Sequence, residues 1–205
     1  SDGTNTTSQS LAITVTDVGP TVITSAATAN FAENGSGTVL DVEATSEGTV
    51  TYSISGGLDA AKFSINSTTG VLSFLSAPDF ENPTDVGANN VYDVDVTAST
   101  AASGVATQSI AITVTAVNDN DPVITSAATA NFAENATGTV IDVNATDADL
   151  PAQTLTFSIT GGADAAKFAI NASTGIVTFI SSPNFEAPTD AGADNVYNLT
   201  VTARL

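Results

Sequence analysis

The chain has 205 residues, 42% of them hydrophobic, and its 22 Asp and Glu residues against 3 Lys and Arg give a formal net charge of −19. A field of this sign repels nucleic acid and attracts divalent cations, and no run of about 18 apolar residues predicts membrane insertion in this segment. The absence of Cys, His, Met and Trp excludes thiol nucleophiles, imidazole bases and the Ser-His-Asp triad, so no enzyme is expected.

The first predicted element is a strand at Ser10–Thr16, whose sequence "SLAITVT" nearly repeats "SIAITVT" at Ser109–Thr115. The later copy ends a complete repeat. Residues 1–19 are therefore interpreted as the last strand of a preceding or neighbouring repeat, followed by a linker. The apolar residues alternate as in a strand with one buried face, at Leu11, Ile13 and Val15.

The rest of the chain is an internal duplication. The segment "VITSAATANFAEN" occurs at Val22–Asn34 and again, unchanged, at Val123–Asn135, 101 residues later. The similarity continues beyond a four-residue insertion near Leu150, which raises the offset to 105 residues. A repeat of this length indicates tandem domains. The sequence places repeat 1 at 20–117, a linker at 118–122 and repeat 2 at 123–205.

Alternating apolar residues and turn signals predict seven strands in repeat 1, which favours an all-β sandwich. In repeat 2, Val196–Ala203 matches the sixth strand, and no seventh strand follows before Leu205. Repeat 2 is thus predicted to lack its last strand in cis and to be open for a donated strand. The predicted strands of repeat 1 lie near Val22–Ser25, Gly37–Ala44, Thr49–Ser55, Lys62–Ile65, Val71–Leu75, Val91–Ala98 and Gln108–Thr115.

The aromatic residues recur at matching positions of the two repeats and are predicted to fill the cores. With no Trp in the chain, little aromatic surface is left on which a sugar ring could stack. This argues against a polysaccharide-binding module. The predicted core aromatics are Phe63, Phe74, Phe80 and Tyr92, with Phe168, Phe179, Phe185 and Tyr197 in repeat 2.

Four short acidic motifs have the composition of a calcium site. They are "NDNDP" at Asn118–Pro122, "FAEN" with Glu33 and Glu134, "DFE" at Asp79–Glu81 and "DAD" at Asp147–Asp149. Calcium takes six to eight oxygen ligands, and closely spaced Asp and Asn side chains deliver several of them from few residues. The alternative is that these are solvated, Asx-rich turns.

Together these motifs resemble the calcium motifs of cadherin repeats, and the chain resembles the bacterial cadherin-like tandem repeats of large surface adhesins or filament proteins. The resemblance covers essentially the whole chain and implies Greek-key, cadherin/immunoglobulin-like sandwiches with Ca2+ as the cofactor. By matching position, it implies metal ligands at Glu33, Asp79, Glu81, Asn118, Asp119, Asn120, Asp147 and Asp149.

The chain also departs from the family pattern. Ala116 stands where an acidic residue is usual two places before the linker Asn, and the junction before repeat 1 has Gly19 without "NDN". Repeat 1 has Ser46–Gly48 where repeat 2 has "DAD", and Asn184 replaces the acidic residue that Asp79 provides. These losses predict calcium-rich and calcium-poor junctions in alternation.

Three functions are considered. The first is a calcium-stiffened structural or adhesive repeat of a bacterial extracellular surface protein, acting as a spacer or in adhesion, secreted or at the cell surface. The second is a filament subunit assembled head to tail, with residues 9–16 of one copy completing repeat 2 of the next; the mass of the natural protein would separate these two. The third is a polysaccharide-binding module. The expected partners are neighbouring copies of the chain and, for the third function, a cell-surface or matrix polysaccharide.

Overall fold

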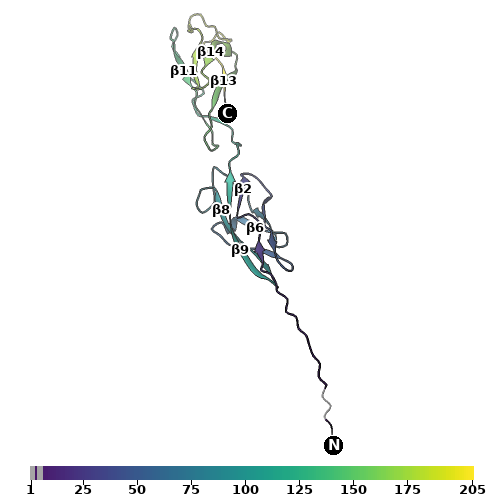
Figure 1. Cartoon of the computed structure of the whole chain (residues 1–205). Coiled ribbons are helices and arrows are strands. Elements are labelled where there is room, and N and C mark those ends of the chain that lie inside the picture. Colours follow the sequence, from purple (N-terminus) through teal and green to yellow (C-terminus); the bar gives the residue numbers. More distant parts are fainter. Residues whose placement is uncertain (1–2, 4–6) are drawn as a thin grey trace. The chain divides into compact units, whose positions relative to one another are not determined.

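Two units make up the chain in the computed structural model, which describes Gly3 and residues 7–205 (Figure 1). The first unit holds the described residues up to Asp79 together with 83–115, and the second holds 80–82 with 116–205. The remainder of the predicted leading segment, residues 1–2 and 4–6, lies outside the described residues. The described part of the chain is all-β, without α-helices, and holds no helix able to span a membrane.

The first unit is a β-sandwich. Its larger sheet has the strand order β2-β9-β8-β5, its smaller sheet the order β3-β7-β6, and β1 pairs with β4. Residues 60–62 form a short 3-10 turn before β6. The strands are β1 (Val22–Ile23), β2 (Thr28–Ala32), β3 (Thr38–Asp41), β4 (Ala44–Thr45), β5 (Thr51–Gly56), β6 (Phe63–Ile65), β7 (Val71–Phe74), β8 (Val91–Thr100) and β9 (Gly104–Thr115).

The core of the first unit lies between the two sheets. Phe63 on the smaller sheet meets Tyr92 on the larger one edge to face, with ring centroids 6.3 Å apart. β8 and β9 run side by side (Figure 1) and pair from Val91 opposite Thr113 to Thr100 opposite Gly104. Because side chains alternate between the faces of a strand, every second residue of these strands enters the core. The fully buried ones are Tyr92, Val94, Val96, Ala98, Ile110, Ile112 and Val114.

The strands of the first unit differ from the sequence prediction at two places. β2 was not predicted, because its segment has weak strand propensity and its parallel partner, β9, lies far away in the sequence. The single strand expected at 37–44 is divided into β3 and β4. Between them the N–H of Val42 donates to the carbonyl of Gly70 across 3.0 Å, which continues the register of β3 on β7 by one residue before the chain reaches β4.

The second unit repeats this architecture with fewer strands. The sheets have the orders β11-β15-β14 and β13-β16, and β10 pairs with β12. Among the described residues, the second unit contains no counterpart of β2 or β9. The strands are β10 (Val123–Ile124), β11 (Thr139–Asp142), β12 (Ala145–Thr146), β13 (Thr156–Gly161), β14 (Phe168–Ile170), β15 (Ile176–Phe179) and β16 (Thr200–Arg204), with a 3-10 turn at Ala165–Lys167.

The core of the second unit is correspondingly thinner. Its buried residues are Val143, Phe157, Phe168 and Val177. Tyr197 packs against them only half-buried, whereas its counterpart Tyr92 is buried. The prediction that Phe185 fills the core is wrong, because this side chain is 64% exposed. It lies in the loop between β15 and β16.

Candidate metal centre

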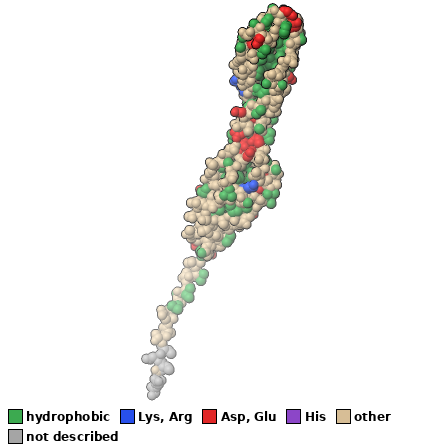
Figure 2. Space-filling view, turned by 180° about the vertical axis from the view of Figure 1, so that it is seen from behind, with side chains coloured by type: hydrophobic (Ala, Val, Ile, Leu, Met, Phe, Trp, Pro, Cys, Tyr) green, Lys and Arg blue, Asp and Glu red, His purple; other side chains and the backbone are tan. Residues whose placement is uncertain are grey.

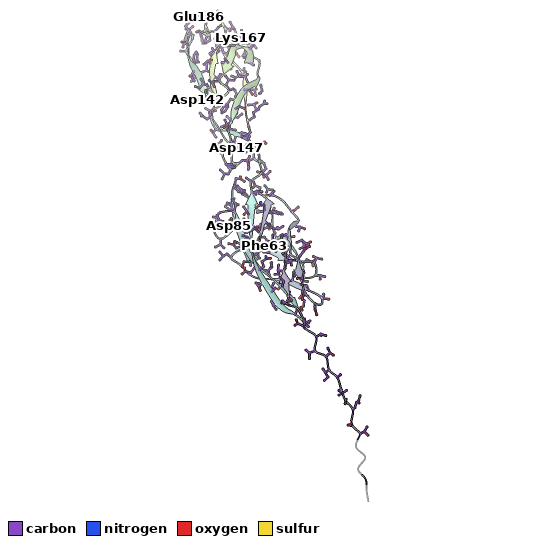
Figure 3. The ribbon with its side chains drawn as sticks, viewed as in Figure 1. Phe63, Asp85, Asp142, Asp147, Lys167 and Glu186 are labelled. Atoms are coloured by element: carbon purple, nitrogen blue, oxygen red, sulfur yellow. The ribbon has the colours of Figure 1, made fainter. Side chains whose placement is uncertain are left out.

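The loop that follows β12 carries two carboxylates in a tight turn. The backbone N–H of Asp149 donates to Oδ1 of Asp147 across 2.9 Å, the kind of local side-chain bond that short Asp residues make in turns. The Asp149 side chain itself is buried, with only 1% exposed. Asp147 is half-buried and lies at the opposite end of the second unit from Glu186 (Figure 3).

The linker residues wrap around the Asp149 carboxylate. The N–H of Asn120 lies 3.2 Å from Oδ1 and 3.3 Å from Oδ2 of Asp149, and the Asn120 side chain donates from Nδ2 to Oδ1 across 2.8 Å. The N–H of Asp119 adds a longer bond of 3.4 Å to Oδ1. Asp149 thus holds the linker residues Asp119 and Asn120 through these hydrogen bonds.

These donors favour the ionised form of Asp149. The side-chain hydrogen bond from Asn120 has the largest effect, and the backbone N–H groups of Asp119 and Asn120 act in the same direction. Together they lower the pKa of Asp149 below its ordinary value of 3.8, although burial opposes the shift. The group is therefore an anion at neutral pH despite its burial.

Glu81 brings a further carboxylate to this place. Its Oε1 accepts a hydrogen bond from the backbone N–H of Leu150 across 3.0 Å. Glu81, Asp119 and Asp149 each offer a carboxylate oxygen, and the three oxygens lie within 4.8 Å of one another. Like charges at this spacing repel one another unless a cation compensates them.

A buried oxygen of Asp147 indicates whether a cation fits this site. Its Oδ2 is buried and has no hydrogen-bond partner among the described residues. A buried carboxylate oxygen without a partner is costly, and a hard cation would satisfy it. Calcium prefers such a donor set, carboxylate oxygens together with the carbonyl oxygens of an Asn-rich segment. The residues therefore fit a calcium ion.

The remaining predicted ligands lie in the first unit or at the start of the linker. Glu33 is buried at the end of β2, where its N–H donates to the carbonyl of Thr115 across 3.0 Å. The N–H of Asn34 donates to the carbonyl of Pro78 across 2.9 Å, which brings Asp79 close. Carboxylate oxygens of Glu33 and Asp79 lie within 4.8 Å of each other. Asn118 is exposed.

In the second unit, Glu134 and Asn184 occupy the positions that correspond to Glu33 and Asp79, and they are arranged differently. Glu134 is exposed, unlike Glu33, and its Oε2 accepts a hydrogen bond from the N–H of Phe185 across 3.1 Å. Asn184 accepts bonds from two backbone N–H groups of its own turn. On the face drawn in Figure 2, acidic side chains gather in a few places instead of covering the surface evenly.

Sequence reasoning missed one participant in this arrangement, the backbone of Leu150, and the role that Asn120 has here. The N–H of Leu150 orients Glu81, and backbone donors carry no signal in the sequence. Asn120, expected as a metal ligand, acts here as a hydrogen-bond donor to Asp149. Its amide nitrogen can only donate, whereas its carbonyl oxygens are the atoms that could bind a cation.

Comparisons with known proteins bear on the fold and on the repeats. No family model matches the chain. The chain is 32% identical to human (Homo sapiens) protocadherin Fat 4 over 170 residues, which cover 80% of this chain and 3% of that protein. It is 40% identical to halomucin of Haloquadratum walsbyi over 77 residues, which cover 37% of this chain and 1% of that protein. The chain thus spans a very small part of the curated relatives that it matches.

The structure resembles a solved pair of cadherin domains. The crystal structure of human protocadherin-24 EC1-2 matches with a TM-score of 0.65 at 20% sequence identity, over 87% of this chain and 89% of that chain. At this level of identity the likeness concerns the fold. The all-β fold of the chain is that of two tandem EC domains.

Proposed function

The chain consists of two tandem cadherin-like repeat domains, and on this premise we propose that it is a calcium-binding structural or adhesive segment of an extracellular surface protein. Domains of this kind are extracellular or at the cell surface and are non-enzymatic. The spacer role and the bacterial source are parts of the proposal. The similarity of the two repeats, which share the unchanged segment Val22–Asn34 and Val123–Asn135, supports the spacer role, because a spacer needs copies of one fold and not a variety of sites.

The observation that carries the proposal is the group of carboxylates around Asp149. Three carboxylate oxygens, from Glu81, Asp119 and Asp149, lie within 4.8 Å of one another, and Asp147 adds a buried oxygen without a described partner. Anions held this close raise the energy of the folded state in the absence of a cation. The arrangement is therefore better suited to an occupied site than to a solvated turn.

Within this proposal, the predicted residues supply the oxygen ligands of the ion. Asp149 and Asp147 supply carboxylate oxygens from one turn, and Glu81, fixed by the N–H of Leu150, supplies another. Asp119 adds a carboxylate from the linker. Glu33, Asp79, Asn118 and Asn120 stay proposed ligands on the resemblance to cadherin repeats. The bound ion would supply the positive charge that compensates these anions.

A thermal unfolding experiment tests the proposal on the full chain. A ligand that binds only the folded state stabilises it by about 2.7 kcal/mol at a concentration of 100 times its Kd, which raises the midpoint of one repeat by roughly 10 °C or more. We expect excess calcium to raise the midpoint relative to a chelator, and an Asp119→Ala, Asp149→Ala variant to lose this response. A wild-type chain with the same midpoint in both conditions would refute the proposal.

A second candidate function is favoured by one observation: Ser10–Thr16 nearly repeats the sequence of the inner strand β9 and pairs with no strand among the described residues. We propose that the chain can serve as a subunit of an extracellular filament assembled head to tail by strand donation. Sheet edges with unpaired N–H and C=O groups readily accept an added strand. Concentration-dependent growth of the particle mass in solution is the expected sign of this function.

A further inference from the structure

Three hydroxyl groups of the first unit form a continuous line of hydrogen bonds. Oγ1 of Thr21, directly before β1, lies 3.1 Å from Oγ of Ser46, directly after β4. Oγ of Ser46 lies in turn 3.2 Å from Oγ1 of Thr100, the last residue of β8. Thr21 is only 6% exposed, and the other two residues are half-buried. This hydroxyl chain, Thr21-Ser46-Thr100, therefore ties three separate segments together at one end of the unit.

One placement of the hydroxyl protons satisfies every bond of the hydroxyl chain. Thr21 donates its proton to the carbonyl of Gly104 across 3.3 Å. Ser46 must therefore donate to Thr21, and Thr100 in turn donates to Ser46. Oγ1 of Thr100 accepts the N–H of Ser103 across 2.9 Å. Each hydroxyl thus donates once and accepts once, so the hydroxyl chain is neutral and its bonds are complete.

The second unit has different residues at two of the matching positions. Pro122 matches Thr21, and Asp147 matches Ser46, both at the offset of 101 residues. Proline has neither a hydroxyl nor an N–H, and an ionised carboxylate accepts hydrogen bonds but cannot donate them. The hydroxyl chain therefore cannot form there. Instead, Oδ2 of Asp147 is buried without a hydrogen-bond partner among the described residues.

The first unit also lacks the carboxylate at the centre of the candidate metal centre. Gly48 matches Asp149. Gly19 matches Asn120, so both partners of the 2.8 Å side-chain bond of the second unit are replaced. The loop keeps one acidic residue, Glu47, but this residue is exposed. The first unit thus has a neutral arrangement of hydroxyls where the second unit gathers anions.

We propose that Thr21 and Ser46 are specificity-determining residues, which close this end of the first unit without an ion and leave calcium to act at the matching end of the second unit. The inference rests on the proposed calcium-binding function and adds which of the two ends responds to the ion. A neutral hydroxyl chain offers a cation no charge, and its oxygens already accept hydrogen bonds. The anions of the second unit, in contrast, need a positive charge to compensate them.

Amide hydrogen exchange on the full chain, measured by NMR with calcium and with a chelator, tests the contrast at single residues. The reporters in the first unit are the amides of Thr21, which donates to the carbonyl of Ser103 across 3.4 Å, and of Ser103 itself. The reporters in the second unit are the amides of Asn120 and Asp149. We expect the chelator to speed exchange of the second pair by about tenfold or more, and to leave the first pair unchanged.

The two ways in which this experiment can fail are distinct. Equal acceleration of both pairs by the chelator would overturn the inference and leave calcium binding standing. No acceleration of either pair would refute the proposed function, and the inference with it.

Ser46→Ala tests whether the hydroxyl chain holds this end of the first unit. The variant removes one donor and one acceptor, so exchange at Thr21 and Ser103 should become about tenfold faster, and equally so with calcium and with chelator. Ser46→Thr keeps a hydroxyl and is the matched control, which should exchange at the wild-type rate. Wild-type exchange in Ser46→Ala would overturn the role of the hydroxyl chain.

Ser46→Asp tests the exclusion of the ion. A carboxylate cannot donate to Thr21, so exchange at Thr21 should be faster than in wild type when chelator is present. Calcium should not restore the wild-type rate, because Gly19 and Gly48 bring no side-chain oxygen to this end of the unit. Recovery by calcium would show that the end accepts a cation through residue 46 alone, and it would overturn the proposal.

Discussion

Asn120 donates a hydrogen bond from Nδ2 to Oδ1 of Asp149 across 2.8 Å, so a side-chain bond fixes the linker to the rest of the second unit independently of the proposed metal ligation. We expect Asn120→Asp to lower the unfolding midpoint by several degrees in chelator, because a hydrogen-bond donor to Asp149 is replaced by a further anion. Calcium should recover most of the loss, since an added carboxylate strengthens a cation site. The check is the midpoint measured in both conditions.

Asn120→Ala is the control for this variant. It removes the same bond without adding a charge, so its loss in chelator should be smaller and calcium should recover less of it. An Asn120→Asp chain that loses the same amount of stability with calcium and with chelator would contradict the account.

Alanine substitutions at Gly175 and Gly138 distinguish the cost of a steric clash from the cost of backbone strain. Both have positive φ, 73° and 114°, where any other residue is strained. A Cβ on Gly175 would lie 2.0 Å from the carbonyl oxygen of Val143, whereas a Cβ on Gly138 would meet nothing within 4 Å. We expect Gly175→Ala to cost about 1–3 kcal/mol more than Gly138→Ala. Denaturant unfolding measures both, and equal losses would show that the close approach of the Val143 backbone is absent.

Much of the fold follows from local sequence signals. The strands at 51–56, 63–65 and 71–74 lie where alternation and turns predict them, because each pairs with a near neighbour or packs one apolar face. β2 could not be predicted in this way, since its strand state depends on the distant β9. For the same reason, its unchanged copy at 129–133 forms no strand in the second unit. One sequence thus has two outcomes, decided by a partner.

The candidate site could be predicted as a set of residue types but not as an arrangement. The spacing in "NDNDP" and "DAD" predicts oxygen ligands, and the structure brings Glu81, Asp119 and Asp149 together. The arrangement around Asp149 depends on hydrogen bonds with the Asp147 side chain and with linker N–H groups, which no spacing encodes. Whether all eight residues bind an ion stays a prediction.

Asp190 gives a prediction for acid conditions. Burial acts to raise its pKa, but the backbone N–H groups of Asp194 and Asn195 outweigh this and hold the pKa below 3.8. A depressed pKa in the folded state contributes stability above pH 3.8, and this contribution is lost as the pH falls through the folded-state value. We expect Asp190→Asn to be less stable than wild type at pH 7, with a difference that shrinks below pH 3.8.

Unfolding midpoints between pH 2.5 and 7 check this prediction. Asp142→Asn, at an exposed strand position, is the control for the loss of one charge and should show a smaller difference. A difference for Asp190→Asn that stays constant across this range would contradict the assignment.

The central claim is that the carboxylates around Asp149 bind calcium, and isothermal titration calorimetry of the full chain with calcium tests it most directly. The comparison is between Asp119→Asn, Asp149→Asn and a control with the same change in charge, Asp41→Asn, Asp142→Asn, whose residues occupy matching exposed positions at the ends of β3 and β11. The account predicts that wild type and control bind calcium and that the first variant loses the site. Equal binding by all three chains, or none by wild type, would contradict it.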